Sequence, residues 1–211
     1  TNDTCANAKT LTLTNGTITE QSTTAFALDE YRNLTCADPW TSPLLDGPQL
    51  YWSLAMSATK NYAITATTTF ADGYVYVFDG NHACSETAIE QDCASEGATG
   101  ISKGAISKGS ATAYFSPPSD GAYKIAIDSY DKAGDVTLKV LEFDSAANQT
   151  CATAKTLTLS GGEVVEDGYT VGTKNEFPGL VKCGQATALD GGQTYYKIAL
   201  TQGQAYSISL H

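Results

Sequence analysis

Residues 2–16 read NDTCANAKTLTLTNG, and residues 148–162 read NQTCATAKTLTLSGG, nearly the same phrase at an offset of 146. The correspondence continues through Glu20 and Glu166 and through Glu30 and Glu176. After a small insertion the offset becomes 144, and LDGPQLYWSLAMSATKNYAIT (45–65) matches LDGGQTYYKIALTQGQAYSIS (189–209). Because each copy is longer than a solenoid repeat, the pattern predicts tandem domains.

The second copy stops early. His211 aligns with Thr67, and the segment from Thr68 to about Phe143 has no counterpart. We therefore expect one complete domain at 1–144 and the N-terminal half of a second at 145–211, in a natural chain that continues. A half domain exposes strand edges and apolar surface, so we expect it to pack on the first domain or on a neighbouring molecule.

The complete copy has the residue pattern of a β protein. Segments 50–56, 61–68, 73–79, 122–128 and 135–141 are rich in β-branched and aromatic residues, and Gly and Asp separate several of them. No segment of ten or more residues shows a helical stripe. The pattern predicts an all-β fold, an antiparallel β-sandwich with jelly-roll strand order. In 73–79 (GYVYVFD) aromatic residues alternate with valine, which indicates either two covered faces or an aromatic platform.

The chain is acidic, with a net charge of −11 from 12 basic and 23 acidic residues. It contains no basic cluster, so nucleic acid is not expected as a partner. No apolar run approaches the roughly 20 residues that span a bilayer. The N-terminus lacks the pattern of a signal peptide, and a secreted protein would have lost that leader before Thr1.

The six cysteines suggest disulfides rather than a metal site. There is no Cys-x-x-Cys, and His82 and His211 are the only histidines. The repeat spacing predicts two bonds, Cys5–Cys36 and Cys151–Cys183, and the remaining pair, which flanks a polar loop, predicts Cys84–Cys93. Disulfides imply an oxidising compartment, so we expect an extracellular or cell-surface location.

Nothing in the sequence points to a catalytic centre. A Ser or Cys nucleophile needs a nearby base, usually His, and the complete copy holds only His82, in a polar loop. Glu30 has a counterpart in Glu176, and a residue kept in both copies more often serves the fold than a reaction. We therefore expect no enzyme activity from the chain itself. A carbohydrate-active hydrolase with unassigned carboxylates is the alternative.

Calcium is the one candidate cofactor, although the fold requires none. Asp128, Asp131 and Asp135 lie between two predicted strands, and Asp72 and Asp79 flank another strand. Closely spaced carboxylates of this kind can ligate calcium. Solvated turns explain the same residues without a metal.

Two aromatic residues are candidates for ligand contact. Trp40 lies in a loop, ADPWTSPLLD, that the second copy shortens, and Tyr130 follows a predicted strand. Exposed aromatic rings stack on sugar faces. The alternative for Trp40 is a lid on one end of the sandwich. Trp52, whose counterpart is Tyr196, is expected in the core.

Four motifs resemble those of the bacterial pre-peptidase C-terminal domain in its cysteine-containing form. They are the segments 2–8 (NDTCANA), 46–51 (DGPQLY), 121–128 (GAYKIAID) and 134–140 (GDVTLKV). Gln49 stands where such domains often carry an acidic residue. The resemblance implies a secreted β-sandwich module that binds matrix, cell wall or polysaccharide, sometimes with calcium. A structural stalk or spacer is the alternative function.

Overall fold

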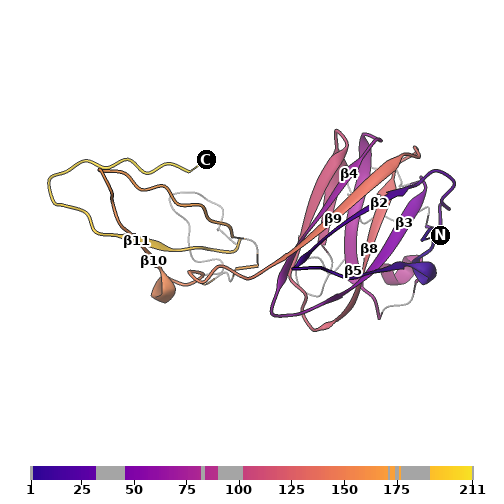
Figure 1. Cartoon of the computed structure of the whole chain (residues 1–211), viewed down its shortest axis with the longest axis horizontal. Coiled ribbons are helices and arrows are strands. Elements are labelled where there is room, and N and C mark those ends of the chain that lie inside the picture. The colour runs from indigo at the N-terminus through magenta and orange to yellow at the C-terminus, as the bar shows by residue number, and fades with distance from the viewer. Residues whose placement is uncertain are drawn as a thin grey trace. The chain divides into compact units, whose positions relative to one another are not determined.

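The computed structural model describes residues 2–31, 46–81, 84–89, 102–170, 172–173, 176 and 191–210. The chain divides into two compact units, Thr1–Asp144 and Ser145–His211. Among its described residues, the first unit contains the short 3₁₀ helix η1 and nine strands (Figure 1): η1 Cys5–Asn7, β1 Lys9–Leu11, β2 Thr17–Thr23, β3 Gln49–Met56, β4 Asn61–Thr68, β5 Asp72–Asp79, β6 Ser102–Ser107, β7 Ser110–Phe115, β8 Gly121–Ser129 and β9 Asp135–Phe143. The second unit contains η2 Cys151–Thr153, β10 Lys155–Leu157 and β11 Tyr196–Ile198.

The nine strands of the first unit have jelly-roll connectivity. The order is β1-β3-β8-β5-β6-β7-β4-β9-β2, and every pairing is antiparallel except β1 with β3. Consecutive strands from β2 to β5 alternate between two groups of four, β2-β9-β4-β7 and β3-β8-β5-β6. The β6–β7 hairpin passes from one group to the other. This arrangement confirms the predicted β-sandwich with jelly-roll order.

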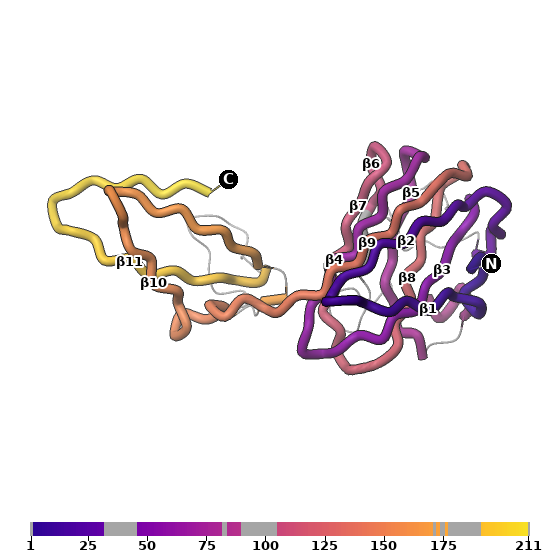
Figure 2. The backbone as a smooth tube through the Cα atoms, viewed as in Figure 1, coloured from indigo at the N-terminus to yellow at the C-terminus, as the bar shows by residue number. Residues whose placement is uncertain are grey.

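The short link between β1 and β2 folds the sheet on itself. These strands lie at opposite ends of the strand order, yet only residues 12–16 separate them. The two ends of the sheet must therefore lie close together, which gives a closed two-layer structure (Figure 2). An ion pair between Lys9 of β1 and Glu20 of β2 joins the two ends.

The main core lies between the two groups of strands. Along β4, Tyr62, Ile64 and Ala66 are buried, while the residues between them are not. The same alternation places Val136, Leu138 and Val140 of β9 in this core. On β3, Trp52 is completely buried opposite Ile125 of β8. Period-two apolar residues thus define the inward face, as the sequence predicted.

A second, smaller core covers the outer face of β3, β8 and β5. Tyr51, Tyr74, Tyr76, Phe78 and Ala126 are buried there, packed with three residues from other segments, Cys5, Tyr31 and Ile89. The stretch 73–79 therefore has both faces covered. The alternative prediction of an aromatic platform in this stretch is wrong.

The second unit repeats the local structure of the first. Lys155 pairs with Tyr196 and Leu157 with Ile198 in parallel, as Lys9 pairs with Trp52 and Leu11 with Leu54. The Asn148 side chain donates to the Tyr195 carbonyl at 2.9 Å, as Asn2 donates to that of Tyr51 at 3.0 Å. In the second unit these contacts join residues 148–157 directly to residues 195–198, so they form without any other strand of the sandwich. Within the described part of the chain, no helix has the length and apolar character needed to cross a membrane.

Candidate functional site

The outer face of the β2-β9-β4-β7 group is open and rich in threonine. Strand register places its side chains in rows, which we call the threonine face: Thr17, Leu141, Ala63 and Tyr114; Thr19, Lys139, Thr65 and Thr112; Gln21, Thr137, Thr67 and Ser110; and Thr23 with Asp135. All fourteen residues are exposed or half-buried. Their neighbours along each strand point inward, so this face is the solvent side of the sandwich.

The threonine face is almost uncharged, although the protein carries a net charge of −11. Asp135 and Lys139 are the only charged residues among its fourteen members. The Thr65 and Thr112 hydroxyls hydrogen-bond to each other at 2.9 Å across neighbouring strands. Tyr114 is 52% exposed and Leu141 is 44% exposed, and both flank Ala63 in the same row. Hydroxyls beside an exposed aromatic ring suit a neutral, hydroxyl-rich ligand.

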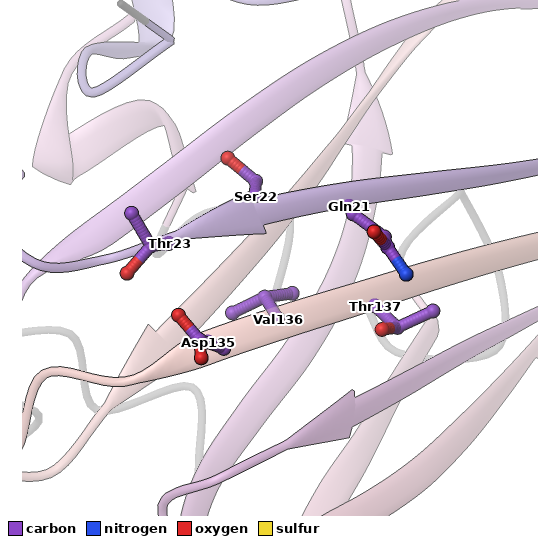
Figure 3. A pocket seen from close by; sticks show the side chains of 6 residues that line it. All are labelled: Gln21, Ser22, Thr23, Asp135, Val136 and Thr137. Carbon is purple, nitrogen blue, oxygen red and sulfur yellow. The ribbon is translucent and has the colours of Figure 1, made fainter.

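An open hollow lies at one end of this face. It is lined by Gln21, Ser22 and Thr23 of β2 and by Asp135, Val136 and Thr137 of β9 (Figure 3). Within it, Thr23 pairs with Asp135 across the two strands. Asp135 is the only ionisable residue in this lining, so the hollow offers hydrogen-bonding groups but no pair of carboxylates for acid–base chemistry.

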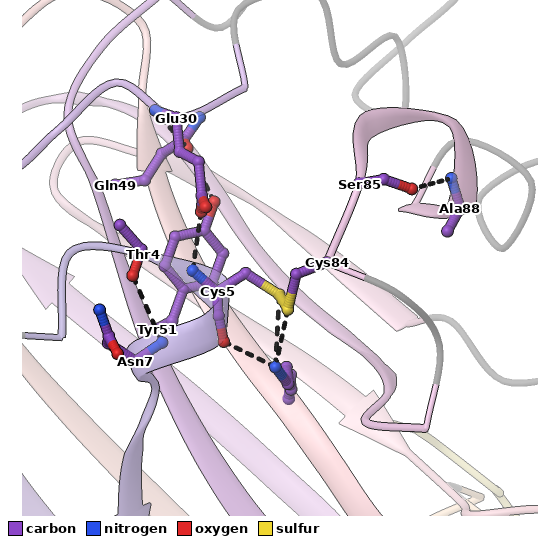
Figure 4. The surroundings of a disulfide bond; sticks show 10 residues. Thr4, Cys5, Asn7, Glu30, Gln49, Tyr51, Cys84, Ser85 and Ala88 are labelled. Atoms are coloured by element: carbon purple, nitrogen blue, oxygen red, sulfur yellow. Dashed lines mark hydrogen bonds between the residues drawn. A yellow bond between two sulfur atoms is a disulfide. The ribbon is translucent and has the colours of Figure 1, made fainter.

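A disulfide fixes the covered face on the opposite side of the sandwich. Cys5 is bonded to Cys84, which lies 79 positions further along the chain (Figure 4). The predicted pairings of Cys5 with Cys36 and of Cys84 with Cys93 are therefore wrong. Cys151 is exposed and has no disulfide partner in the described part of the chain. Cys36, Cys93 and Cys183 lie outside the described residues, so Cys151–Cys183 stays a prediction.

The strand order explains why the repeat spacing of the cysteines predicted the wrong disulfide partner for Cys5. Lys124 of β8 pairs with Ser53 of β3 on one side and with Phe78 of β5 on the other. The Lys124 amino group lies 2.8 Å from the Cys84 sulfur and 2.6 Å from the Cys5 carbonyl oxygen. The two cysteines thus meet beside Lys124 of β8. In the strand order, β8 lies between β1, which follows Cys5 in the chain, and β5, which precedes Cys84.

Burial lowers the pKa of Lys124, and the nearby Glu30 carboxylate partly opposes this effect. Glu30 also accepts a hydrogen bond from the Cys5 backbone N–H at 2.7 Å. Glu176 accepts from the Cys151 N–H at the same distance of 2.7 Å in the second unit. The carboxylate common to both copies therefore holds the first turn of each unit, which supports a structural role for Glu30.

Gln49 organises a buried polar network beside the disulfide. Its side-chain oxygen accepts from the Tyr51 hydroxyl at 2.7 Å and from the Tyr31 N–H at 3.1 Å. Its amide group donates to the Tyr31 carbonyl at 2.8 Å and to Asp128 at 2.9 Å. An amide supplies both donors and acceptors at this position, which an acidic side chain cannot do at neutral pH.

Asp128 is 1% exposed and has a pKa well above the ordinary aspartate value. Desolvation is the main cause, and the negative charge of Asp29 adds to it, whereas the hydrogen bond from Gln49 acts in the opposite direction. The structure favours the neutral acid here, because a charged carboxylate in this position loses its hydration.

We expect Asp128→Asn to flatten the pH dependence of stability. Between the ordinary pKa of about 3.9 and the raised value, the native state holds a proton that the unfolded chain releases, so wild-type stability falls as pH rises. In D128N the amide oxygen accepts from Gln49 without titrating. The free energy of unfolding of D128N relative to wild type should therefore increase with pH, as measured by urea unfolding at several pH values from 4 upward.

Asp135→Asn is the matched control, because Asp135 is exposed in the other strand group. It should follow the wild-type pH profile. A D128N profile parallel to that of wild type would contradict a raised Asp128 pKa.

The carboxylates predicted as calcium ligands fall in different places. Asp128 is buried at the end of β8, whereas Asp131 and Asp135 are exposed. Asp72 and Asp79 lie at opposite ends of β5. Among the described residues, no group of three or more His, Cys, Asp or Glu side chains is placed to hold a metal ion. Calcium binding stays a prediction.

Tyr130, one of the two aromatic residues predicted to contact a ligand, is not on the threonine face. Tyr130 is half-buried and packs edge-on against Tyr74, with ring centroids 6.2 Å apart. Trp40 lies outside the described residues, as does His82. Sequence reasoning missed Tyr114, the exposed aromatic of the open face. The segment SATAYF (110–115) alternates between exposed and buried positions, and Tyr114 occupies an exposed position in this alternation.

The chain was compared with protein-family models and with curated proteins. No family model matches the chain, and no curated protein matches it. The likeness to pre-peptidase C-terminal domains therefore rests on the sequence motifs alone.

Proposed function

We propose that the chain is a secreted, non-catalytic binding module whose threonine face contacts a neutral polysaccharide of a cell wall or extracellular matrix. The observation that carries the proposal is the contrast between the two outer faces of the sandwich. A second core and a disulfide cover one face, while the other presents fourteen residues with only two charges. The Cys5–Cys84 bond supports an extracellular location, since disulfides persist in oxidising compartments.

The chemistry of the face favours a glycan over other ligands. Its hydroxyl and amide groups offer both donors and acceptors, and the Tyr114 ring offers a surface for stacking on a sugar. A phosphate-rich ligand would need clustered Lys and Arg, and Lys139 is the one basic residue among the fourteen. The face also holds a single carboxylate, so it lacks the pair that glycoside hydrolysis requires.

Tyr114→Ala should weaken polysaccharide binding by about tenfold, the equivalent of about 1.4 kcal/mol, because the stacking surface is lost. The measurement is depletion of the protein by insoluble cellulose, chitin and xylan, with affinity electrophoresis in soluble glucans and mannans. Tyr114 is exposed, so circular dichroism should show an unchanged fold and unfolding midpoint.

Phe26→Asn is the matched control. Phe26 is fully exposed at a φ of 70°, a backbone conformation that asparagine tolerates, and it lies outside the threonine face. This variant should bind like wild type. Equal losses in both variants would point to nonspecific adsorption. An absence of binding by the wild-type protein to every glycan would favour the spacer function and reject the proposal.

A further inference from the structure

Four residues of the threonine face form a straight line across its four strands. Each lies one strand over and two residues along from the one before it, in the order Tyr114 of β7, Thr65 of β4, Thr137 of β9 and Thr23 of β2. Diagonal neighbours on one face of a sheet are about 7–8 Å apart, so the three steps together span about 20–25 Å. We call these four residues the diagonal.

The opposite diagonal of the same face has a different character. It runs from Thr17 of β2 through Lys139 of β9 to Thr67 of β4. A charged side chain therefore stands at its middle, and none of its members is aromatic. The diagonal that starts at Tyr114 carries an exposed ring at one end and no charge along its length, which suits a neutral sugar chain.

The diagonal ends in the hollow of the threonine face. Thr137 and Thr23 both line this hollow, and Asp135 lies opposite Thr23 within it (Figure 3). The Thr23 hydroxyl is already engaged, because it donates to the Gly134 carbonyl at 3.2 Å and accepts from the Ala25 N–H at 3.2 Å. Asp135 is exposed, and its carboxylate offers acceptors for the hydroxyl groups of a sugar.

The backbone that carries the Asp135 carboxylate is held in place. The Asp135 N–H donates to the Thr69 hydroxyl at 2.8 Å, and its carbonyl accepts from the Thr69 N–H at 3.0 Å. Thr24 holds Gly134 in the same way, since its hydroxyl accepts at 2.8 Å and its N–H donates at 2.9 Å. A Cβ at Gly134 would lie 2.4 Å from the Thr69 hydroxyl, so a larger residue would displace this contact. The carboxylate therefore projects from a fixed position, as a binding group requires.

We propose that the ligand is a linear neutral glycan that crosses the threonine face along the diagonal, with one sugar stacked on Tyr114 and another bound in the hollow by Asp135. This inference rests on the proposed function and adds the direction and the minimum length of the chain. The two contacts lie about 20–25 Å apart, so several sugars must separate the one on Tyr114 from the one at Asp135. A disaccharide or a compact branched glycan therefore reaches only one end, and the ring of Tyr114 holds it there.

The test measures the affinity of the full chain for oligosaccharides of increasing length, from disaccharide to octasaccharide, by isothermal titration calorimetry. The probes are the cello-, xylo-, chito- and manno-oligosaccharides. We expect the affinity to rise by about tenfold or more once the chain is long enough to reach the hollow, because the second contact then forms within the same complex. Beyond that length the affinity should level off.

Asp135→Ala should weaken the longest oligosaccharide by about fivefold and leave the disaccharide unchanged, because only a long chain reaches the hollow. Asp131→Ala is the matched control. It removes the same charge from an exposed residue between β8 and β9 that belongs neither to the threonine face nor to the hollow. This variant should bind every length like wild type, and circular dichroism should show an unchanged fold for both variants.

The outcomes separate this inference from the proposed function. Equal affinity at every chain length, or equal binding by the two variants, would overturn the diagonal and leave glycan binding by the face intact. A loss in Asp135→Ala that is as large for the disaccharide would place short chains in the hollow, and would overturn it too. Absence of binding by the wild-type protein to every glycan would reject the proposed function and this inference together.

Discussion

Removing the Cys5–Cys84 disulfide is expected to lower the free energy of unfolding of the first unit by about 4.5 kcal/mol. This value follows from the chain entropy that a cross-link removes from an unfolded loop of 79 residues. The bond also joins η1 to the segment that carries Ile89, and so holds together the cover over β3, β8 and β5. We therefore expect this loss to be among the largest of any single substitution.

The pairing is tested by a double-mutant cycle. Cys5→Ala, Cys84→Ala and the double variant should lose the same stability in urea unfolding, because each removes the same bond. Additive losses would mean that the two cysteines belong to different disulfides, as the repeat spacing had predicted.

Peptide mapping gives a direct measurement. Trypsin releases Cys5 in residues 1–9 but leaves Cys84 and Cys93 together in residues 61–103, so a second cleavage after Glu86 and Glu90 is needed. Free thiols are alkylated before digestion, which limits thiol exchange, and the digest should yield a peptide containing Cys5 joined to one containing Cys84.

Trp52→Ala should cost about 3–5 kcal/mol, whereas Tyr196→Ala at the same repeat position should cost less than about 0.5 kcal/mol. Trp52 is completely buried opposite Ile125, and its truncation leaves a cavity in the main core. Among the described residues its indole nitrogen has no hydrogen-bond partner, so we expect the loss to come from packing. Tyr196 is 38% exposed, and neither hydrophobic core of the described residues includes it.

This pair of variants separates intrinsic residue preference from packing. Both residues are aromatic, and both lie on a strand paired in parallel with a preceding short strand. Urea unfolding followed by circular dichroism gives the two free energies. Similar losses would show that the second unit buries Tyr196 in solution, against the exposure seen here.

The alternation of apolar residues predicted the inner strands well. Segments 50–56, 61–68, 73–79, 122–128 and 135–141 all lie within strands of the structure, with small differences at their ends. Each of these strands buries at least one face in the main core, so apolar residues recur at every second position or more often along it. The strands β2 (TITEQST) and β6 (SKGAIS) were not predicted from the sequence, because polar residues dominate both.

The threonine face was not predictable as a unit. Thr17, Thr19 and Thr23 show the alternation in β2, and Thr65 and Thr67 show it in β4. Threonine favours strands for conformational reasons, so its presence on a solvent face carries no ligand signal by itself. These two strands become neighbours only through β9, which pairs with β2 on one side and β4 on the other.

The sequence by itself determined the repeat, the positions of the core strands and the sandwich class. The extended, pleated backbone of a strand points successive side chains to opposite faces, so burial of one face produces an alternating pattern in the sequence. Only the tertiary structure decided which outer face is covered, which cysteine Cys5 binds, and that the core positions of the second unit lie open. Each of these depends on which distant strands become neighbours, and residues far apart in the chain leave no periodic trace of that choice.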